Sequence, residues 1–251
     1  MLRIDQLRLL PDQPESDLTA KCARLLRTDP SSLRDLTVLR RAIDAREGLT
    51  FVYTVAVSAP QEAALLRRCR DKRVTAYVPE QYALPAPVAP PEVRPIVVGA
   101  GPAGLFAALV LARCGARPIL LERGQPVERR SRDVARFWRT GRLDTESNVQ
   151  FGEGGAGAFS DGKLNTGTRD LRHRYIMEQL AACGAPESIL TDALPHVGTD
   201  KLHIALRNLR QQLLDAGADI RFGARLEGFT ARDGALTAVT VRQGEQLYTL
   251  P

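Results

Sequence analysis

Gly99, Gly101 and Gly104 leave three backbone positions of one short segment without side chains. They follow a short apolar run, residues 96–98, which is typical of a buried parallel strand. Glycine at the first position allows a tight turn, the second lets a diphosphate approach the backbone, and the third lets the next helix pack closely. The spacing therefore predicts a strand, a turn and a helix that bind the diphosphate of a dinucleotide.

The helix expected after this turn has a start suited to an anion. Pro102 fits the first helical turn, where its missing N–H costs nothing. The remaining N–H groups there, that of Ala103 included, would face a phosphate at the positive end of the helix dipole. Residues 103–113 are apolar on nearly every face, which predicts a buried helix, and Gly115 is expected to end it.

A carboxylate stands at the end of the next predicted strand, "PILLE". Glu122 closes that strand 21 residues after Gly101. A carboxylate in this place accepts hydrogen bonds from ribose hydroxyls and would repel a 2′-phosphate. We therefore predict that Glu122, with the adjacent Arg123, binds the adenosine half of a cofactor that is not phosphorylated at the 2′ position.

A second glycine-rich stretch, "GEGGAGAFSDGKLN", covers residues 152–165. Flexible linkers also collect glycine, but they rarely combine it with flanking phenylalanines (Phe151 and Phe159), a lysine and an asparagine. We interpret the stretch as a cradle for a ligand. The alternative is a tight glycine loop with no ligand.

Other residues able to do chemistry form no further recognisable site. His173, His196 and His203 lack metal-ligand spacing with cysteines or carboxylates, so no metal is expected. His203 falls on a predicted helix, where a structural role is favoured, and His196 is the one histidine we consider near a substrate. No hydrolase or P-loop motif occurs in a suitable context, which leaves oxidoreductases as the enzyme class.

Composition and charge exclude several classes of protein. The chain has 251 residues and a formal net charge of +6, but the excess is mostly arginine spread along the sequence, so a nucleic-acid partner is disfavoured. No apolar run approaches the roughly 20 residues that cross a bilayer, and the N-terminus lacks the apolar region of a signal peptide. A cytoplasmic location is expected. Four cysteines lie more than forty residues apart, which indicates free thiols rather than a zinc or redox pair: Cys22, Cys69, Cys114 and Cys183.

The N-terminal part, residues 1–83, is predicted to be a small α+β domain. Strands are expected at "RIDQLRL", at residues 39–46, at "LTFVYTVAV" and at "VTAYV". A helix capped by Ser16, with Leu18, Cys22 and Leu25 on one face, and a helix with a Ser58 and Gln61 capping box alternate with them. The order β-α-β-β-α-β is that of a ferredoxin-like fold.

Arginines of this domain raise the possibility of an RNA-binding or partner-binding face. A solvated surface is the favoured interpretation, because no aromatic RNA-binding strand accompanies them. The arginines concerned are Arg40, Arg41, Arg46, Arg67, Arg68, Arg70 and Arg73.

A proline-rich linker, residues 84–95, separates this domain from the rest. Five prolines in eleven residues remove N–H donors and favour an extended path. Residues 96–251 then read as a Rossmann-like α/β sheet. It continues through a helix with Leu202, Ala205, Leu206, Leu209 and Leu213 on one face, a stop at Gly217 and a strand near residue 220. Turns at Asp233-Gly234 and Gln243-Gly244 indicate an antiparallel meander inserted in that sheet.

These motifs resemble known flavoproteins. "VVGAGPAGL" with "LLERG" resembles the glutathione-reductase-like FAD-binding fold. "SNVQFGEGGAGAFSDGKLNTGTRD" with "PHVGTDKL" is similar to a bacterial family of uncharacterised FAD-dependent dehydrogenases. The resemblance implies an FAD-dependent oxidoreductase with an unknown small-molecule substrate and NAD(P)H as a possible electron donor. It also implies FAD contacts at Gly154, Gly155 and Ser160, with Lys163 near the flavin edge, where a cation stabilises negative charge on the reduced ring.

One departure from the family leads to an expectation about completeness. The sequence stops at "LYTLP", inside the meander, whereas family members continue through a substrate domain and a late strand. We expect a truncated chain that binds FAD weakly or not at all, while the full-length equivalent purifies with its flavin. Two alternatives stay open: an NAD-binding dehydrogenase or regulator, and a non-enzymatic nucleotide-binding or RNA-binding module.

Overall fold

The computed structural model describes residues 1–164 and 170–251, and these form two compact units. Unit 1 comprises Met1–Gln81, the described part of Leu164–Arg174, and Glu187–Pro195. Unit 2 comprises Tyr82–Lys163, Tyr175–Pro186 and His196–Pro251. The predicted domain limits at 83 and 96 stay a prediction, and residues 165–169 of the second motif lie outside the described residues.

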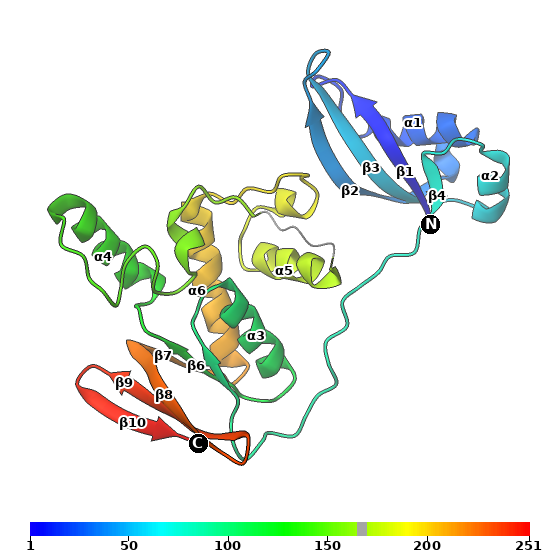
Figure 1. Ribbon diagram of the computed structural model, residues 1–251. Coiled ribbons are helices and arrows are strands. Elements are labelled where there is room, and N and C mark those ends of the chain that lie inside the picture. The colour runs from blue at the N-terminus through cyan, green and yellow to red at the C-terminus, as the bar shows by residue number, and fades with distance from the viewer. Residues whose placement is uncertain (165–169) are drawn as a thin grey trace. The chain divides into compact units, whose positions relative to one another are not determined.

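Unit 1 is a four-stranded antiparallel sheet with two helices (Figure 1). Its elements follow the order strand, helix, strand, strand, helix, strand, as the sequence predicts. They are β1 (Leu2–Leu9), α1 (Asp17–Leu26), β2 (Arg34–Asp44), β3 (Thr50–Ser58), α2 (Glu62–Arg68) and β4 (Val74–Ala76), and the sheet order is β2-β3-β1-β4. Both helices pack on the same face, because Leu18 and Leu65 join one core cluster with Ile4 and Val55.

Helix starts in unit 1 differ from the prediction. Ser16 has helical backbone angles and its side chain makes no capping hydrogen bond, so its predicted capping role is wrong. At α2 the residue before the helix is Gln61 in a left-handed conformation, and the carboxylate of Glu62 accepts the N–H of Ala59. The predicted capping box is therefore wrong as well. Of the strand predicted at residues 39–46, residues 39–44 form the end of the longer strand β2, which begins at Arg34.

Unit 2 is built on a three-stranded parallel sheet of order β5-β6-β7. The strands are β5 (Ile96–Val98), β6 (Ile119–Glu122) and β7 (Asp219–Phe222), and the helices are α3 (Pro102–Arg113), α4 (Val127–Thr140), α5 (Leu171–Ala182, which begins in unit 1) and α6 (Thr199–Asp215). Helices α3 and α6 pack together on one side of this sheet (Figure 1). The five apolar residues predicted for one face of α6 are all buried.

An antiparallel meander follows the parallel sheet. Strands β8 (Ala224–Arg232), β9 (Ala235–Gln243) and β10 (Gln246–Leu250) pair in the order β10-β9-β8, with the first turn at Asp233-Gly234 as predicted. Ile119 and Leu121 of β6 share a core cluster with Ala224 and Val241. The meander therefore packs against the parallel sheet.

Short 3-10 turns complete the described elements: Pro30–Ser32, Ala156–Phe159 and Glu187–Leu190. Helix α3 is less buried than predicted, because Ala103 and Ala107 are exposed while Leu105, Ala108, Leu109 and Ala112 are buried. Among the helices in the described part of the chain, none has the length and apolar character required to cross a membrane.

Candidate functional site

The glycine-rich turn between β5 and α3 has the geometry that its spacing predicts. Gly99 has φ +94°, a conformation that disfavours other residues. A Cβ on Gly104 would overlap the carbonyl oxygen of Gly99, so only glycine lets α3 approach the strand this closely. In contrast, a Cβ on Gly101 would meet no atom of the described residues within 4 Å. Open space therefore lies beside Gly101, where a diphosphate is expected.

Helix α3 presents free backbone donors at this turn. Gly101 is its N-cap, Pro102 is its first residue, and no side chain of the described residues caps the helix. The N–H groups of Ala103 and Gly104 lie in the first turn, where an α-helix offers no carbonyl partner. Since Ala103 is exposed, these donors and the positive end of the helix dipole are available to an anion.

Glu122 lies against this turn, where it accepts hydrogen bonds from backbone amides. Its side chain is 5% exposed. Oε2 accepts the N–H of Ala100 at 2.7 Å, and Oε1 accepts the N–H groups of Gly124 at 2.8 Å and Gly152 at 2.9 Å. One carboxylate thus ties together the first glycine turn, the end of β6 and the second glycine-rich stretch. Ribose binding by Glu122 stays a prediction, and Oε2 retains acceptor capacity for it.

The second glycine-rich stretch packs directly on the first. The N–H of Gly154 donates to the carbonyl oxygen of Ala100 over 2.8 Å. A Cβ on Gly155 would lie 3.2 Å from Cδ of Pro102 and 3.4 Å from Cα of Gly101. Both glycines have positive φ, and a Cβ on Gly154 would overlap the side chain of Leu206. The predicted residues Gly154 and Gly155 are therefore brought to the turn around Gly101.

A buried arginine that the sequence interpretation missed holds this stretch in place. Arg130 of α4 is 0% exposed, and its guanidinium donates to backbone carbonyl oxygens of the loop. The acceptors are those of Asn148 (2.9 Å), Val149 (2.9 Å), Gly152 (3.3 Å), Glu153 (2.6 Å) and Gly155 (2.8 Å). The guanidinium also lies 4.6 Å from the ring centre of Phe159. Burial lowers the pKa of Arg130 to about 10, which leaves it charged at neutral pH.

Glu153, also missed, is the buried acid of the same loop. It is 0% exposed, and its Oε2 accepts the N–H of Val127 at 2.8 Å and a guanidinium N–H of Arg210 at 2.7 Å. Its Oε1 has no hydrogen-bond partner among the described residues. Burial raises the pKa of Glu153 to about 7, although Arg210 favours the charged form. The only sequence signal for this acid is its place between glycines.

The other predicted cofactor residues, Arg123, Ser160 and Lys163, pair with groups outside the turn at residues 99–104. Arg123 pairs with Glu146 at 3.1 Å and stacks 4.0 Å from the ring centre of Phe151. Ser160 donates to the carbonyl oxygen of Gly157 at 3.1 Å, and Lys163 pairs with Asp161 at 2.7 Å on the surface. Within residues 1–164 and 170–251, neither the Ser160 nor the Lys163 side chain has a hydrogen bond or ion pair to residues 99–104.

His196 and His203 of unit 2 contact backbone carbonyl oxygens of the second glycine-rich stretch. The ring Nε2 of His203 lies 2.8 Å from the carbonyl oxygen of Ala158, and that of His196 lies 2.5 Å from the carbonyl oxygen of Asp161. His203 therefore has a structural contact, as its helical position predicts. The same kind of contact at His196 ties the segment before α6 to the loop.

Two protein families match parts of this chain. Residues 1–58 match a domain of unknown function (DUF8436), and residues 92–142 match the family described as FAD binding domain. The second match contains the turn at residues 99–104 together with Glu122 and Arg123. It supports FAD as the cofactor.

A curated relative covers nearly the whole chain. An uncharacterized protein of Clostridium beijerinckii is 40% identical over 243 residues, which are 96% of this chain and 46% of the relative. The chain therefore spans about half the length of the curated relative that it matches.

Several solved structures are partly similar. They include THI4 of Thermovibrio ammonificans, at 18% identity with a TM-score of 0.38, covering 60% of this chain and 48% of that one. The 3-ketosteroid-delta4-(5alpha)-dehydrogenase of Rhodococcus jostii RHA1 has 15% identity and a TM-score of 0.38, covering 61% and 42%. Aklavinone-11 hydroxylase, solved with FAD and aklavinone, has 22% identity and a TM-score of 0.33, covering 63% and 31%.

Proposed function

We propose that unit 2 is the FAD-binding part of an FAD-dependent oxidoreductase that acts on a small molecule. The observation that carries this proposal is the turn at residues 99–104. Open space beside Gly101 and the free N–H groups of Ala103 and Gly104 fit a diphosphate, and the family match over residues 92–142 supports FAD as its source. The finer fold assignments belong to the same proposal: a glutathione-reductase-like sheet with an inserted meander in unit 2, and a ferredoxin-like unit 1.

Each predicted residue has a defined part in the proposal. Gly99 and Gly104 shape the turn, and Gly101 leaves room for the diphosphate. Glu122 Oε2 accepts a ribose hydroxyl while its other bonds hold the loops, and Arg123 lies beside it. Such a carboxylate disfavours a 2′-phosphate, which matches FAD and NAD better than NADP.

The second glycine-rich stretch extends the proposed site along the cofactor. A Cβ on Gly154 would overlap Leu206, and one on Gly155 would press on Pro102, so glycine at both positions lets this stretch pack closely against the turn. Ser160 and Lys163 follow, where we place the ribityl chain and the flavin edge. The bound flavin would supply the hydride chemistry, and the chain supplies position, charge and exclusion of water. Lys163, paired with Asp161, would stabilise negative charge at the ring.

Ligand-dependent unfolding of the purified chain tests the proposal. Because we expect this chain alone to bind FAD weakly, the titration extends to high ligand concentration. There FAD should raise the free energy of unfolding more than NAD⁺ at equal concentration, since a ligand stabilises the folded state that binds it. The Gly101→Ala variant should fold normally and lose this response, because its new Cβ occupies the space proposed for the diphosphate. The full-length Clostridium beijerinckii relative, purified in parallel, should carry flavin absorbance that bleaches with NADH or NADPH.

Stronger stabilisation by NAD⁺ than by FAD would support the second candidate, an NAD-binding dehydrogenase. That candidate is retained because the turn and Glu122 would serve the adenosine half of NAD equally well. Stabilisation by NAD⁺ and none by FAD, together with a colourless full-length relative, would overturn the flavin assignment. Equal stabilisation of wild type and Gly101→Ala would overturn the location of the site.

A further inference from the structure

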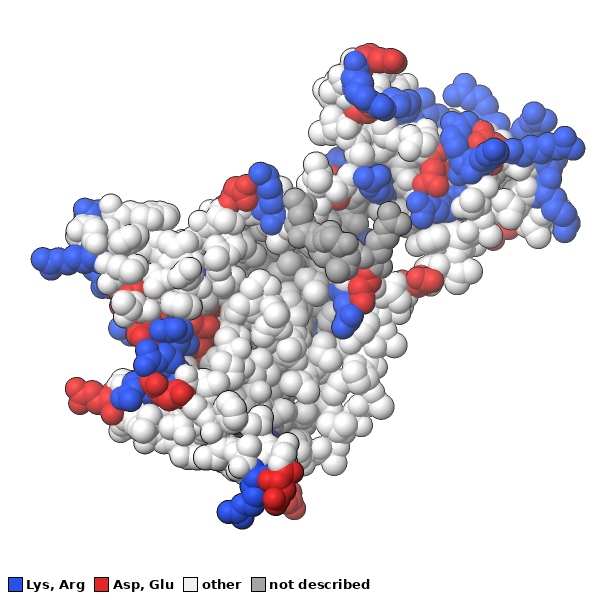
Figure 2. Space-filling view, viewed as in Figure 1, with Lys and Arg blue, Asp and Glu red and all other residues white. Residues whose placement is uncertain are grey.

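Unit 1 carries a basic groove that is not used by the proposed flavin site. It has a volume of about 770 Å³ and is lined by residues of β1, of α1 with its C-cap, and of the segment from α2 to β4. Figure 2 shows lysines and arginines gathered over the end of unit 1 that carries α1 and α2. The cations that line the groove include Lys21, Arg24, Arg27, Arg68, Arg70 and Arg73.

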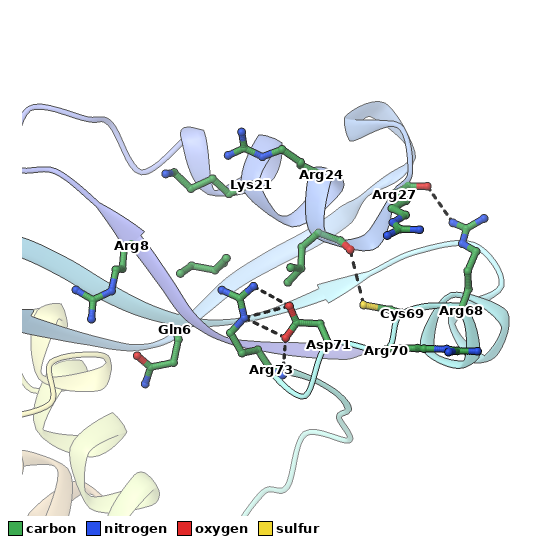
Figure 3. Close-up of a pocket in the computed structure, with 12 residues that line it drawn as sticks. Gln6, Arg8, Lys21, Arg24, Arg27, Arg68, Cys69, Arg70, Asp71 and Arg73 are labelled. Carbon is green, nitrogen blue, oxygen red and sulfur yellow. Dashed lines mark hydrogen bonds and ion pairs between the residues drawn. The ribbon is translucent and has the colours of Figure 1, made fainter.

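The cations come from two opposite walls of the groove (Figure 3). Lys21 and Arg24 lie three residues apart on α1, hence on one helix face, and Arg27 follows as the C-cap. Arg70 and Arg73 belong to the segment after α2 on the facing side. Sequence segments more than forty residues apart thus converge on one surface, which is why the charge looks dispersed in the sequence.

Most of this charge is not neutralised within the protein. Among the described residues, the one acid that lines the groove is Asp71, which is paired with Arg73 at 2.7 Å. Arg68 donates to the carbonyl oxygens of Leu26 and Arg27, which keeps its charge. In the part of the chain that the structure describes, Lys21, Arg24, Arg27 and Arg70 have no ion-pair partner. An anion can therefore replace their counterions without breaking an internal salt bridge.

The lining selects among anionic partners. Arginine predominates, and its planar guanidinium binds phosphate in a bidentate manner. Among the described residues, no aromatic side chain lines the groove, and the apolar lining consists of Leu7, Leu25 and Cys69. A nucleotide base or a large apolar peptide side chain therefore has little surface to pack against. A nucleic-acid strand carries one phosphate per about 3.4 Å of helix axis, so several phosphates can meet the two rows of cations.

We propose that the groove of unit 1 binds nucleic acid through its sugar-phosphate backbone, without reading the bases. Affinity then depends on the number of phosphates neutralised and falls steeply with salt. A duplex is bound as well as a single strand, because no stacking platform favours unpaired bases.

Fluorescence anisotropy tests this proposal on the whole 251-residue chain. The probes are a labelled RNA duplex of about 20 base pairs and one of its strands, titrated from about 50 to about 300 mM salt. The groove variant combines Lys21→Gln, Arg24→Gln and Arg70→Gln. The control variant removes the same charge elsewhere, at the exposed Arg132, Arg139 and Arg232, also by glutamine.

The groove variant should bind at least about tenfold more weakly at 100 mM salt, and the slope of log Kd against log salt should fall by about 2 to 3. The control variant should behave as wild type, and circular dichroism should show both variants folded. Wild-type binding absent at 50 mM salt, or weakened equally in the two variants, would overturn the proposal. So would displacement of the probe by ATP or poly-glutamate at concentrations at which unlabelled duplex fails.

Discussion

The amide nitrogen of Gly154 lies 2.8 Å from the carbonyl oxygen of Ala100, to which it donates a hydrogen bond. This bond joins the two glycine-rich segments into one surface, and Glu122 reinforces it by accepting the amides of Ala100 and Gly152. The proposed cofactor surface is therefore a single unit whose parts depend on one another.

Two alanine substitutions in one turn should have opposite effects. Gly104→Ala places a Cβ against the carbonyl oxygen of Gly99, so helix and strand must move apart, and we expect a loss of stability of about 1–3 kcal/mol. Gly101→Ala meets no atom within 4 Å and should unfold like wild type in urea. Urea titration followed by circular dichroism measures both. A stable Gly104→Ala variant would contradict the close packing of α3 on β5.

Arg130→Lys should disorder the second glycine-rich loop even though the charge is kept. A lysine ammonium cannot replace the fork that donates from Nε, Nη1 and Nη2 to carbonyl oxygens in the loop, and carbonyls left unpaired in the interior cost free energy. We expect a loss of about 3 kcal/mol, at the lower end of what breaking a buried charge network costs. Limited proteolysis should cut residues 148–155 faster. Arg132→Lys, on the exposed side of the same helix, is the matched control.

The regular elements of this chain were predictable because their determinants are local. The five buried residues of α6 follow the helical period, and the steric role of Gly104 follows from its spacing to Gly99. The predicted capping interactions of α1 and α2 were wrong, because Ser16 and Gln61 adopt backbone conformations that no local pattern specifies. Local patterns thus predict elements better than they predict their ends.

The ionic parts of the structure depend on contacts between distant segments. Arg130 resembled the other arginines of a basic helix, yet it is the one that points into the loop and is fully buried. The groove of unit 1 also depends on the fold, since Arg24 and Arg70 line the same groove only when α1 and α2 pack on one sheet face. Charge counted along a sequence does not locate such surfaces.

Glu122→Gln should cost more than the same change at Glu146. The amide side chain puts an NH₂ group where an oxygen now accepts a backbone N–H, so at least one of three buried hydrogen bonds is lost and two donors face each other. We expect a loss of about 1–3 kcal/mol. Glu146 forms half-exposed pairs with Arg123 and Arg225, which contribute at most about 1 kcal/mol. Equal urea midpoints for the two variants would contradict the anchoring role of Glu122.

Glu153 should make unit 2 less stable as the pH rises toward neutrality. Burial raises its pKa in the folded protein to about 7, above the ordinary value of 4.5, so the folded state binds a proton more tightly than the unfolded state does. Stability is therefore unaffected by this group below about pH 4.5 and falls as the pH rises to about 7, by about 3 kcal/mol in total.

Substitution by glutamine isolates this effect. Glu153→Gln keeps an acceptor for the N–H of Val127 and removes the ionisation, so the fall in unfolding free energy between about pH 5 and pH 7 should disappear. Urea titrations across that range measure it, with Glu245→Gln, an exposed position, as the control. Arg210 keeps its second partner, Glu128, at 2.6 Å, so the variant should still fold. An unchanged pH slope in Glu153→Gln would mean that the carboxylate is charged in the interior at all these pH values, held by Arg210.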